Sequence, residues 1–336
     1  MISEARLVAG TATGVGSLPH TDPHTAATTV VRLLPELPAV PELPKRDPRE
    51  GLVARAAAAI EGIRVAPDGT VGLTGPVGRN SAIRPDLDDG FHLGVTTLLD
   101  VLAADDRHRP RSVKIQTVGP LTLGTALLTV GVAPREAFPL AARVASAWIE
   151  ALEDRVATAL PGVGVLAVLD EPALVIWRSH DGPIPREDAT DVLSSVLAGM
   201  RATSGVHVCG VGDLRLVLDA GPRVVHFDVA ALDLDDAAPL GRHLDADGWV
   251  AWGAVPTHGP VGEHPQPLWK GLVETWCELT NRGCDSARLR TQALVAPACG
   301  LAGHGVSQAE RALALAHEIG NRVHLQVAAA RLSVGA

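Results

Sequence analysis

The 336-residue sequence contains no tyrosine, and aromatic residues make up only 3% of it. Its core must therefore be built mainly from alanine, valine and leucine, for which a hydrophobic content of 46% is ample. Lysine is also scarce, no run of basic residues occurs, and the formal net charge is −9. These features exclude nucleic acid and anionic membrane surfaces as main partners, because phosphate binding requires clustered lysine and arginine.

A secretion signal and a membrane span are missing as well. The N-terminal MISEARLVAG carries Glu4 and Arg6 and has no long apolar run, so we expect no signal peptide. The longest apolar stretch, VATALPGVGVLAVL, is interrupted by Pro161 and two glycines and is too short to span a bilayer. We therefore expect a cytoplasmic protein, whose four cysteines are free thiols or metal ligands rather than disulfides.

Strand-like and helix-like segments alternate along almost the whole chain. Short, apolar, β-branched segments bounded by Gly, Pro or Asp predict eight strands, at residues 13–19, 39–44, 112–119, 163–172, 205–210, 223–230, 249–255 and 293–300. Segments such as 134–160 between them show helical spacing of apolar residues. This order predicts a single α/β domain over residues 1–336, a (β/α)8 TIM barrel, with a doubly wound open sheet as the rival fold. Segment 51–111, with a possible hairpin in IRVAPDGTVGLTG, is interpreted as an insertion.

Polar residues and cysteines lie at or just beyond the C-terminal ends of the predicted strands. They are Ser17, Glu42, Asp170, Glu171, His207, Cys209, Asp228, His258 and Cys299. Barrel active sites are assembled at this end from the loops that follow several strands, so the distribution favours the barrel.

Two cysteines and a histidine are the strongest candidates for chemistry. In GVHVCG, residues 205–210, His207 and Cys209 lie two positions apart, so strand alternation points both side chains to one face. In a closed barrel Cys299 lies across the mouth from His207. Imidazole and two thiolates suit zinc. A His-x-Cys pair alone is more typical of an ordinary buried strand end, and the third ligand is what favours a metal site.

Other polar residues have competing explanations. Asp228 is a candidate fourth ligand, because a carboxylate at the end of an apolar strand must be paired, hydrated or metal-bound. His226, two residues earlier on the same face, competes for that position. Asp170 and Glu171, in VLDEPAL, could clamp a substrate ammonium or fix a loop. His258, in GAVPTHGP, could exchange a proton near neutrality, although most such histidines are only solvated.

Six short motifs, in order, resemble the C-terminal, catalytic half of cobalamin-independent methionine synthase. They are GVGSLPHT, VLDEPAL, HVCG, VVHFDVA, GAVPTHGP and VAPACGL, and they span roughly residues 12–305. Uroporphyrinogen-decarboxylase-like barrels share the architecture but would not explain His-x-Cys with a distant Cys. The resemblance implies a (β/α)8 barrel of this type, with a Zn²⁺ ion that activates homocysteine, or a similar thiol, for S-methylation to methionine.

The resemblance also implies roles for individual residues. The family's zinc ligands are matched by His207, Cys209 and Cys299. Asp228 falls where the family has a glutamate ligand, and it is one methylene shorter. The positions that hold the amino acid part of homocysteine are matched by Ser17, Glu42 and Asp170. His258 matches the histidine that protonates the departing methyl carrier.

The methyl donor that the resemblance implies is a methyl-tetrahydrofolate. The segment TVGPLTLGTALL matches the family's TGPVT region but lacks the tryptophan that stacks on the folate, and no lysine-rich patch is present for a polyglutamate tail. A methylated corrinoid protein is therefore an alternative donor for the same zinc chemistry. A catalytically degenerate, ligand-binding barrel is the other alternative, given the Asp-for-Glu change at Asp228.

Overall fold

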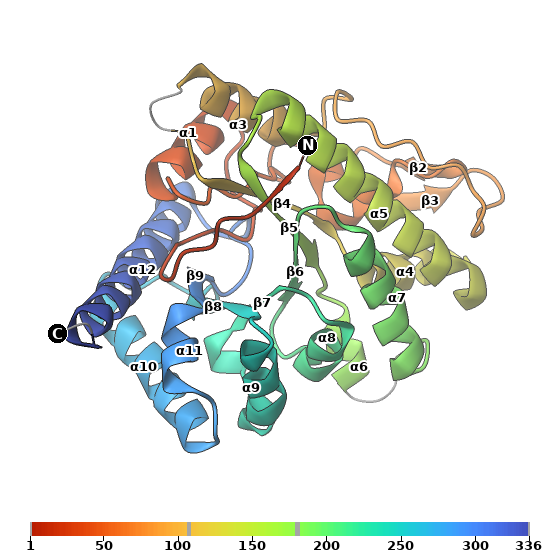
Figure 1. Cartoon of the computed structure of the whole chain (residues 1–336). Coiled ribbons are helices and arrows are strands. Elements are labelled where there is room, and N and C mark those ends of the chain that lie inside the picture. The colour runs from red at the N-terminus through yellow and green to blue at the C-terminus, as the bar shows by residue number, and fades with distance from the viewer. Residues whose placement is uncertain (1, 106–108, 179–181, 335–336) are drawn as a thin grey trace.

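A computed structural model of the chain describes residues 2–105, 109–178 and 182–334. Its central element is a curled parallel sheet in the order β4–β5–β6–β7–β8–β9, with the short β1 also paired to β5. The strands are β1 Ser3–Glu4, β4 Ser112–Val118, β5 Gly164–Asp170, β6 Thr203–Val208, β7 Val224–Asp228, β8 Trp249–Val255 and β9 Ala293–Pro297. Figure 1 shows the helices arranged around these central strands.

The α-helices are α1 Pro23–Leu33, α2 Leu52–Ala57, α3 Leu93–Ala104, α4 Pro120–Thr129, α5 Pro134–Ala159, α6 Leu174–Arg178, α7 Arg186–Gly199, α8 Leu214–Ala220, α9 Ala237–Asp245, α10 Pro265–Asn281, α11 Ser286–Thr291 and α12 Val306–Val334. The described residues also form the short 3₁₀ helices η1 Pro48–Glu50, η3 Val229–Ala231 and η4 Leu234–Asp236. In the described part of the chain, no helix combines the length and apolar character that crossing a bilayer requires.

Six of the eight predicted strands are confirmed as β4 to β9, and the predicted helix over 134–160 is confirmed as α5. The two remaining predicted strands, at residues 13–19 and 39–44, do not form regular strands, so the regular sheet does not close into an eight-stranded barrel. These two segments are extended, but they make only isolated parallel bridges: Ala12 to Val295, Ser17 to Glu42 and Ala39 to Lys114. The regular sheet is therefore a half-barrel.

Proline explains why the segment at 39–44 forms no regular strand. Pro38, Pro41 and Pro44 recur every third residue, and each lacks the backbone N–H that a central strand needs. Between them, the amide of Val40 donates to the carbonyl of Lys114, and the amide of Glu42 donates to the carbonyl of Gly16. Residues 39–44 thus bond to β4 on one side and to the 13–19 segment on the other, without forming a regular ladder of β-sheet hydrogen bonds.

Inward-facing side chains form an apolar layer below a polar one. The lower layer, towards the amino ends of the strands, consists of Leu37, Leu166, Val168, Val224, Ala251 and Leu294. Ala5 and Leu7 of the N-terminal segment, red in Figure 1, pack against this layer. Because alternate strand residues share a face, the inward row of β5 continues from Leu166 and Val168 to Asp170. The polar layer therefore lies at the carboxyl ends.

The predicted hairpin in the insertion is confirmed. Strands β2 Ile63–Val65 and β3 Val71–Leu73 pair antiparallel in a separate sheet. The insertion also supplies α2, whose Arg55 is buried and reaches the polar layer of the half-barrel. The insertion therefore contributes a side chain to the polar layer.

Candidate metal centre

Three side chains that can bind metal converge at the carboxyl ends of β6 and β9. His207 lies in β6, Cys209 follows that strand directly, and Cys299 lies two residues beyond β9. Cys209 Sγ is 3.1 Å from His207 Nε2 and 3.1 Å from Cys299 Sγ. One ligand atom from each of the three lies within 4.8 Å of the others. Within residues 2–105, 109–178 and 182–334, no other group of three His, Cys, Asp or Glu side chains has this geometry.

The cluster fits a metal ion by distance and by donor chemistry. Two ligands held about 2.0–2.3 Å from one zinc ion lie no more than about 4.6 Å apart, and both 3.1 Å separations are within that limit. Imidazole and thiolate suit zinc, copper or iron. His207 is buried, and the two cysteines are half-buried. These three residues could therefore hold a metal ion.

The two thiols of the cluster titrate very differently. A hydrogen bond from Cys209, followed by the interaction with His207, lowers the pKa of Cys299 from its usual 9.0 to about 4. The same contact with Cys299, together with burial, raises the pKa of Cys209. Thiolate is the form that ligates a metal ion.

His226 and Asp228 lie on the inner face of the next strand, β7. The ring of His226 stacks on that of His207, with centroids 4.3 Å apart, and its Nε2 lies 3.0 Å from the carbonyl oxygen of Pro297. Burial holds the pKa of His226 well below its usual value, so the ring is neutral. Asp228 is outside the cluster: its Oδ1 accepts from the amide of Ala230 and caps η3. Its predicted role as fourth ligand stays a prediction.

Asp170 is the last residue of β5 and pairs in register with His207 of β6. Its Oδ1 is buried and has no hydrogen-bond partner. Burial raises the pKa of Asp170 to about 6, against the opposing effect of Lys114 and then of His207. An unpartnered buried carboxylate oxygen is costly, so this atom is a free acceptor beside the cluster.

Glu171 turns away from the cluster and fixes a loop, which was one of the alternatives for the acid pair. Its carboxylate accepts hydrogen bonds from the amides of Leu121 and Thr122 and from the Thr122 hydroxyl, in the first turn of α4. Burial raises the pKa of Glu171 to about 7. A Cβ at Gly119 would lie 2.2 Å from Glu171 Oε1, so the loop after β4 closes tightly around this side chain.

Glu42 lies in a buried polar network beside Asp170. Its Oε1 lies 2.5 Å from Arg55 Nη2 and accepts a hydrogen bond from Gln116 Nε2 at 3.0 Å. Lys114 Nζ donates to the carbonyl oxygen of Val15 at 2.6 Å and to Gln116 Oε1 at 3.3 Å. One carboxylate oxygen of Glu42 is thus already engaged by two donors.

Sequence reasoning missed the two buried cations of this network, Lys114 and Arg55, which are 2% and 6% exposed. Burial lowers the pKa of Lys114, while Asp170 and Glu42 oppose that effect. The side chains of Lys114 and Arg55 thus oppose the negative charge of the carboxylates of Asp170 and Glu42. A signal for Lys114 was present: SVKIQTVG places Lys and Gln at alternate positions of an otherwise apolar strand, where a polar group needs a buried partner.

The two remaining predicted site residues are Ser17 and His258. Ser17 pairs with Glu42 in an isolated bridge, and its Oγ packs on Gly300, where an added Cβ would lie 2.1 Å away. Ser17 therefore borders the residue that follows Cys299. His258 is exposed, on the loop after β8. The structure places it at the same end of the strands but not in the cluster.

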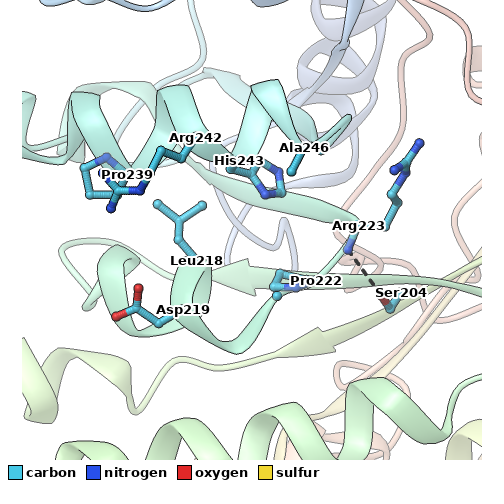
Figure 2. A pocket seen from close by; sticks show the side chains of 11 residues that line it. Ser204, Leu218, Asp219, Pro222, Arg223, Pro239, Arg242, His243 and Ala246 are labelled. Carbon is cyan, nitrogen blue, oxygen red and sulfur yellow. Dashed lines mark hydrogen bonds between the residues drawn. The ribbon is translucent and has the colours of Figure 1, made fainter.

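A separate pocket of about 370 Å³ lies at the opposite end of the strands, near the starts of β6, β7 and β8. Figure 2 shows its lining, including the hydrogen bond from the amide of Arg223 to Ser204 Oγ. The side chains of Arg223 and Arg242 lie on different sides of it, and His243 Nε2 is engaged by the carbonyl of Trp249. No set of convergent groups forms there, so the candidate site remains the cluster at the carboxyl ends.

No protein-family model and no curated protein sequence matches this chain. Its function must therefore be inferred from the geometry and chemistry of its own residues.

Proposed function

We propose that this protein is a zinc-dependent thiol S-methyltransferase that converts homocysteine to methionine with a donor of the methyl-tetrahydrofolate type. The observation that carries the proposal is the convergence of His207, Cys209 and Cys299 beside the unpartnered Oδ1 of Asp170. A sulfur-rich metal site next to a buried acid suits a substrate with a thiol at one end and an ammonium at the other.

The proposal includes the complete (β/α)8 architecture. The two extended segments near residues 13–19 and 39–44 lie between β9 and β4, and isolated bridges connect them to both strands and to each other. Counted with the six long strands, they complete a ring of eight extended segments. All the proposed functional residues then lie at the carboxyl end of that ring, as in other barrel enzymes.

Zinc is the metal we assign to the cluster, with His207, Cys209 and Cys299 as ligands. A bound zinc ion would favour the thiolate form of a substrate thiol, which is the nucleophilic form. The two cysteine thiolates balance the charge of the ion, so the substrate sulfur keeps its electron density. The half-buried cysteines leave the substrate access to this side of the site.

Asp170 holds the substrate ammonium in this proposal. Its Oδ1 is free to accept, whereas Oε1 of Glu42 is engaged by Arg55 and Gln116. Glu42 therefore has a supporting role and contributes its second oxygen. Ser17, which borders Gly300, donates to the substrate carboxylate.

Methyl transfer then forms one bond and breaks one. The substrate sulfur bonds to the methyl carbon, the bond from that carbon to the donor nitrogen breaks, and its electron pair stays on the nitrogen. A proton must reach that nitrogen. His258, on the exposed loop after β8, is the residue we assign as its source.

The proposal is tested by metal content and by turnover. The purified chain should hold about one zinc per chain, and Cys209→Ser and Cys299→Ser should each lose it. Cys277→Ser is the matched control, because Cys277 is an exposed free thiol on α10. Zinc-loaded protein should then form methionine from homocysteine and methyl-tetrahydrofolate. Turnover with methylcobalamin but not with methyl-tetrahydrofolate would identify a corrinoid as the methyl donor. Failure to form methionine from either donor would overturn the proposal.

A further inference from the structure

His226 is connected to both halves of the metal cluster. It lies on β7, between the strand that carries His207 and the strand that precedes Cys299. Its ring stacks on the His207 ring at a centroid distance of 4.3 Å and an interplanar angle of 28°. Its Nε2 lies 3.0 Å from the carbonyl oxygen of Pro297, two residues before Cys299. One buried side chain thus contacts two ligand-bearing segments that are far apart in the sequence.

The contact with Pro297 crosses β8, which lies between β7 and β9. The residue of β8 paired with His226 is Ala251, and Gly253 follows on the same face. A Cβ at Gly253 would lie 2.5 Å from the carbonyl oxygen of Phe227 and 2.9 Å from a backbone carbon of Ala298. Nothing larger than glycine fits there. The residues of β8 on this face, Ala251 and Gly253, are therefore both small.

The hydrogen bond fixes which nitrogen of His226 carries the proton. A carbonyl oxygen only accepts, so Nε2 must donate. This nitrogen is therefore not available to a metal ion, and His226 lies outside the cluster of possible ligands. The same bond fixes the end of β9, and the stacked ring restricts rotation of His207. Groups behind the ligands commonly orient them in this way.

We propose that His226 is a positioning residue of the metal centre, which holds the His207 ring and the Cys299 segment in register for one ion. The inference rests on the metal centre of the proposed function but not on methyl transfer. It adds a residue that sets metal affinity and coordination geometry through His207 and Pro297, without itself binding metal.

Two substitutions separate the two contacts. His226→Phe keeps an aromatic ring against His207 but removes the donor to Pro297, whereas His226→Gln keeps an N–H donor and removes the ring. Zinc affinity, measured by competition with a chromophoric chelator, should fall about 10- to 100-fold in His226→Phe. His226→Gln should recover part of that loss. The absorption bands of the Co²⁺-substituted protein should shift in both variants.

His243→Phe is the matched control, because the Nε2 of this half-buried histidine also bonds a backbone carbonyl, that of Trp249, at the far end of the strands. It should leave zinc affinity and the Co²⁺ spectrum unchanged. Wild-type affinity and spectrum in both His226 variants would overturn this inference alone. Failure of the wild-type protein to bind Zn²⁺ or Co²⁺ would overturn it together with the metal centre of the proposed function. If His226→Phe does not fold, His226→Gln alone tests the inference: wild-type zinc affinity and a wild-type Co²⁺ spectrum in this variant would overturn it.

Discussion

Asp170 and His207 are paired in register across β5 and β6, yet the buried Oδ1 of Asp170 accepts no hydrogen bond. The acid therefore lies directly beside the metal cluster with an unused acceptor. Lys114 opposes the rise in the pKa of Asp170 most strongly, but its Nζ donates hydrogen bonds to the carbonyl oxygen of Val15 and to Gln116 Oε1. This arrangement leaves Asp170 available for a cationic group that enters from outside.

Asp170→Asn should weaken the binding of amino thiols selectively. A hydrogen bond to a charged group contributes about 1.5–3 kcal/mol, which corresponds to a rise of about 10- to 100-fold in KM for homocysteine. Metal content should not change, and neither should the rate with 2-mercaptoethanol, which lacks an amino group. The measurement is steady-state kinetics with both thiols. An equal loss for the two thiols would show that Asp170 does not bind the ammonium.

Lys114→Met should destabilise the protein, because it leaves the buried carboxylates of Glu42 and Asp170 without one of their two cations. Removing one partner of a buried charged group typically costs about 3–5 kcal/mol. Urea unfolding measures the change, and Lys114→Met with Asp170→Asn should be less destabilised than Lys114→Met alone. Lys270→Met is the control: this exposed lysine pairs with Glu274 on one helix face, and its loss should cost under about 0.5 kcal/mol.

Much of this arrangement follows from local sequence pattern. Alternation alone predicts that His207 and Cys209 share a face, and apolar runs locate β4 to β9. The contact with Cys299 was predicted only with the additional assumption of a closed barrel, and the curled sheet brings the two sites together without regular closure. The pattern could not reveal that Arg55, in the insertion, pairs with Glu42, because only tertiary packing brings them together. It also could not reveal the hydrogen bond from His226 to Pro297, which crosses a third strand, β8.

Stability should depend on pH through Glu171. Burial raises its pKa in the folded state from the usual 4.5 to about 7, so between these values the folded protein binds more protons than the unfolded chain. The contribution of Glu171 to the free energy of unfolding is therefore fully present below pH 4.5. It decreases by roughly 3 kcal/mol as the pH rises towards 7. Buried histidines with lowered pKa values act in the opposite direction, so the comparison must be made with Glu171→Gln.

The unfolding free energy of the wild type minus that of Glu171→Gln, measured by urea at several pH values, isolates this contribution. The difference should decrease as the pH rises from 4.5 to 7 and should be flat above that range. Glu171→Gln should also be less stable than the wild type at low pH, since the amide serves the donors of Leu121 and Thr122 less well. A difference that increases with pH would show that the three hydrogen bonds to Glu171 outweigh its burial.

Asp228→Ala separates two roles for the residue predicted as the fourth ligand. Its Oδ1 accepts from the amide of Ala230 at 2.9 Å, so we expect a capping role. The variant should lose about 1 kcal/mol of stability and bind zinc within about 10-fold of the wild type. Cys299→Ala should lose zinc. Asp233→Ala, which removes the cap of η4, is the control for lost capping alone. Zinc loss in Asp228→Ala as complete as in Cys299→Ala would instead make Asp228 a ligand, because removal of a cap alone does not release a metal ion.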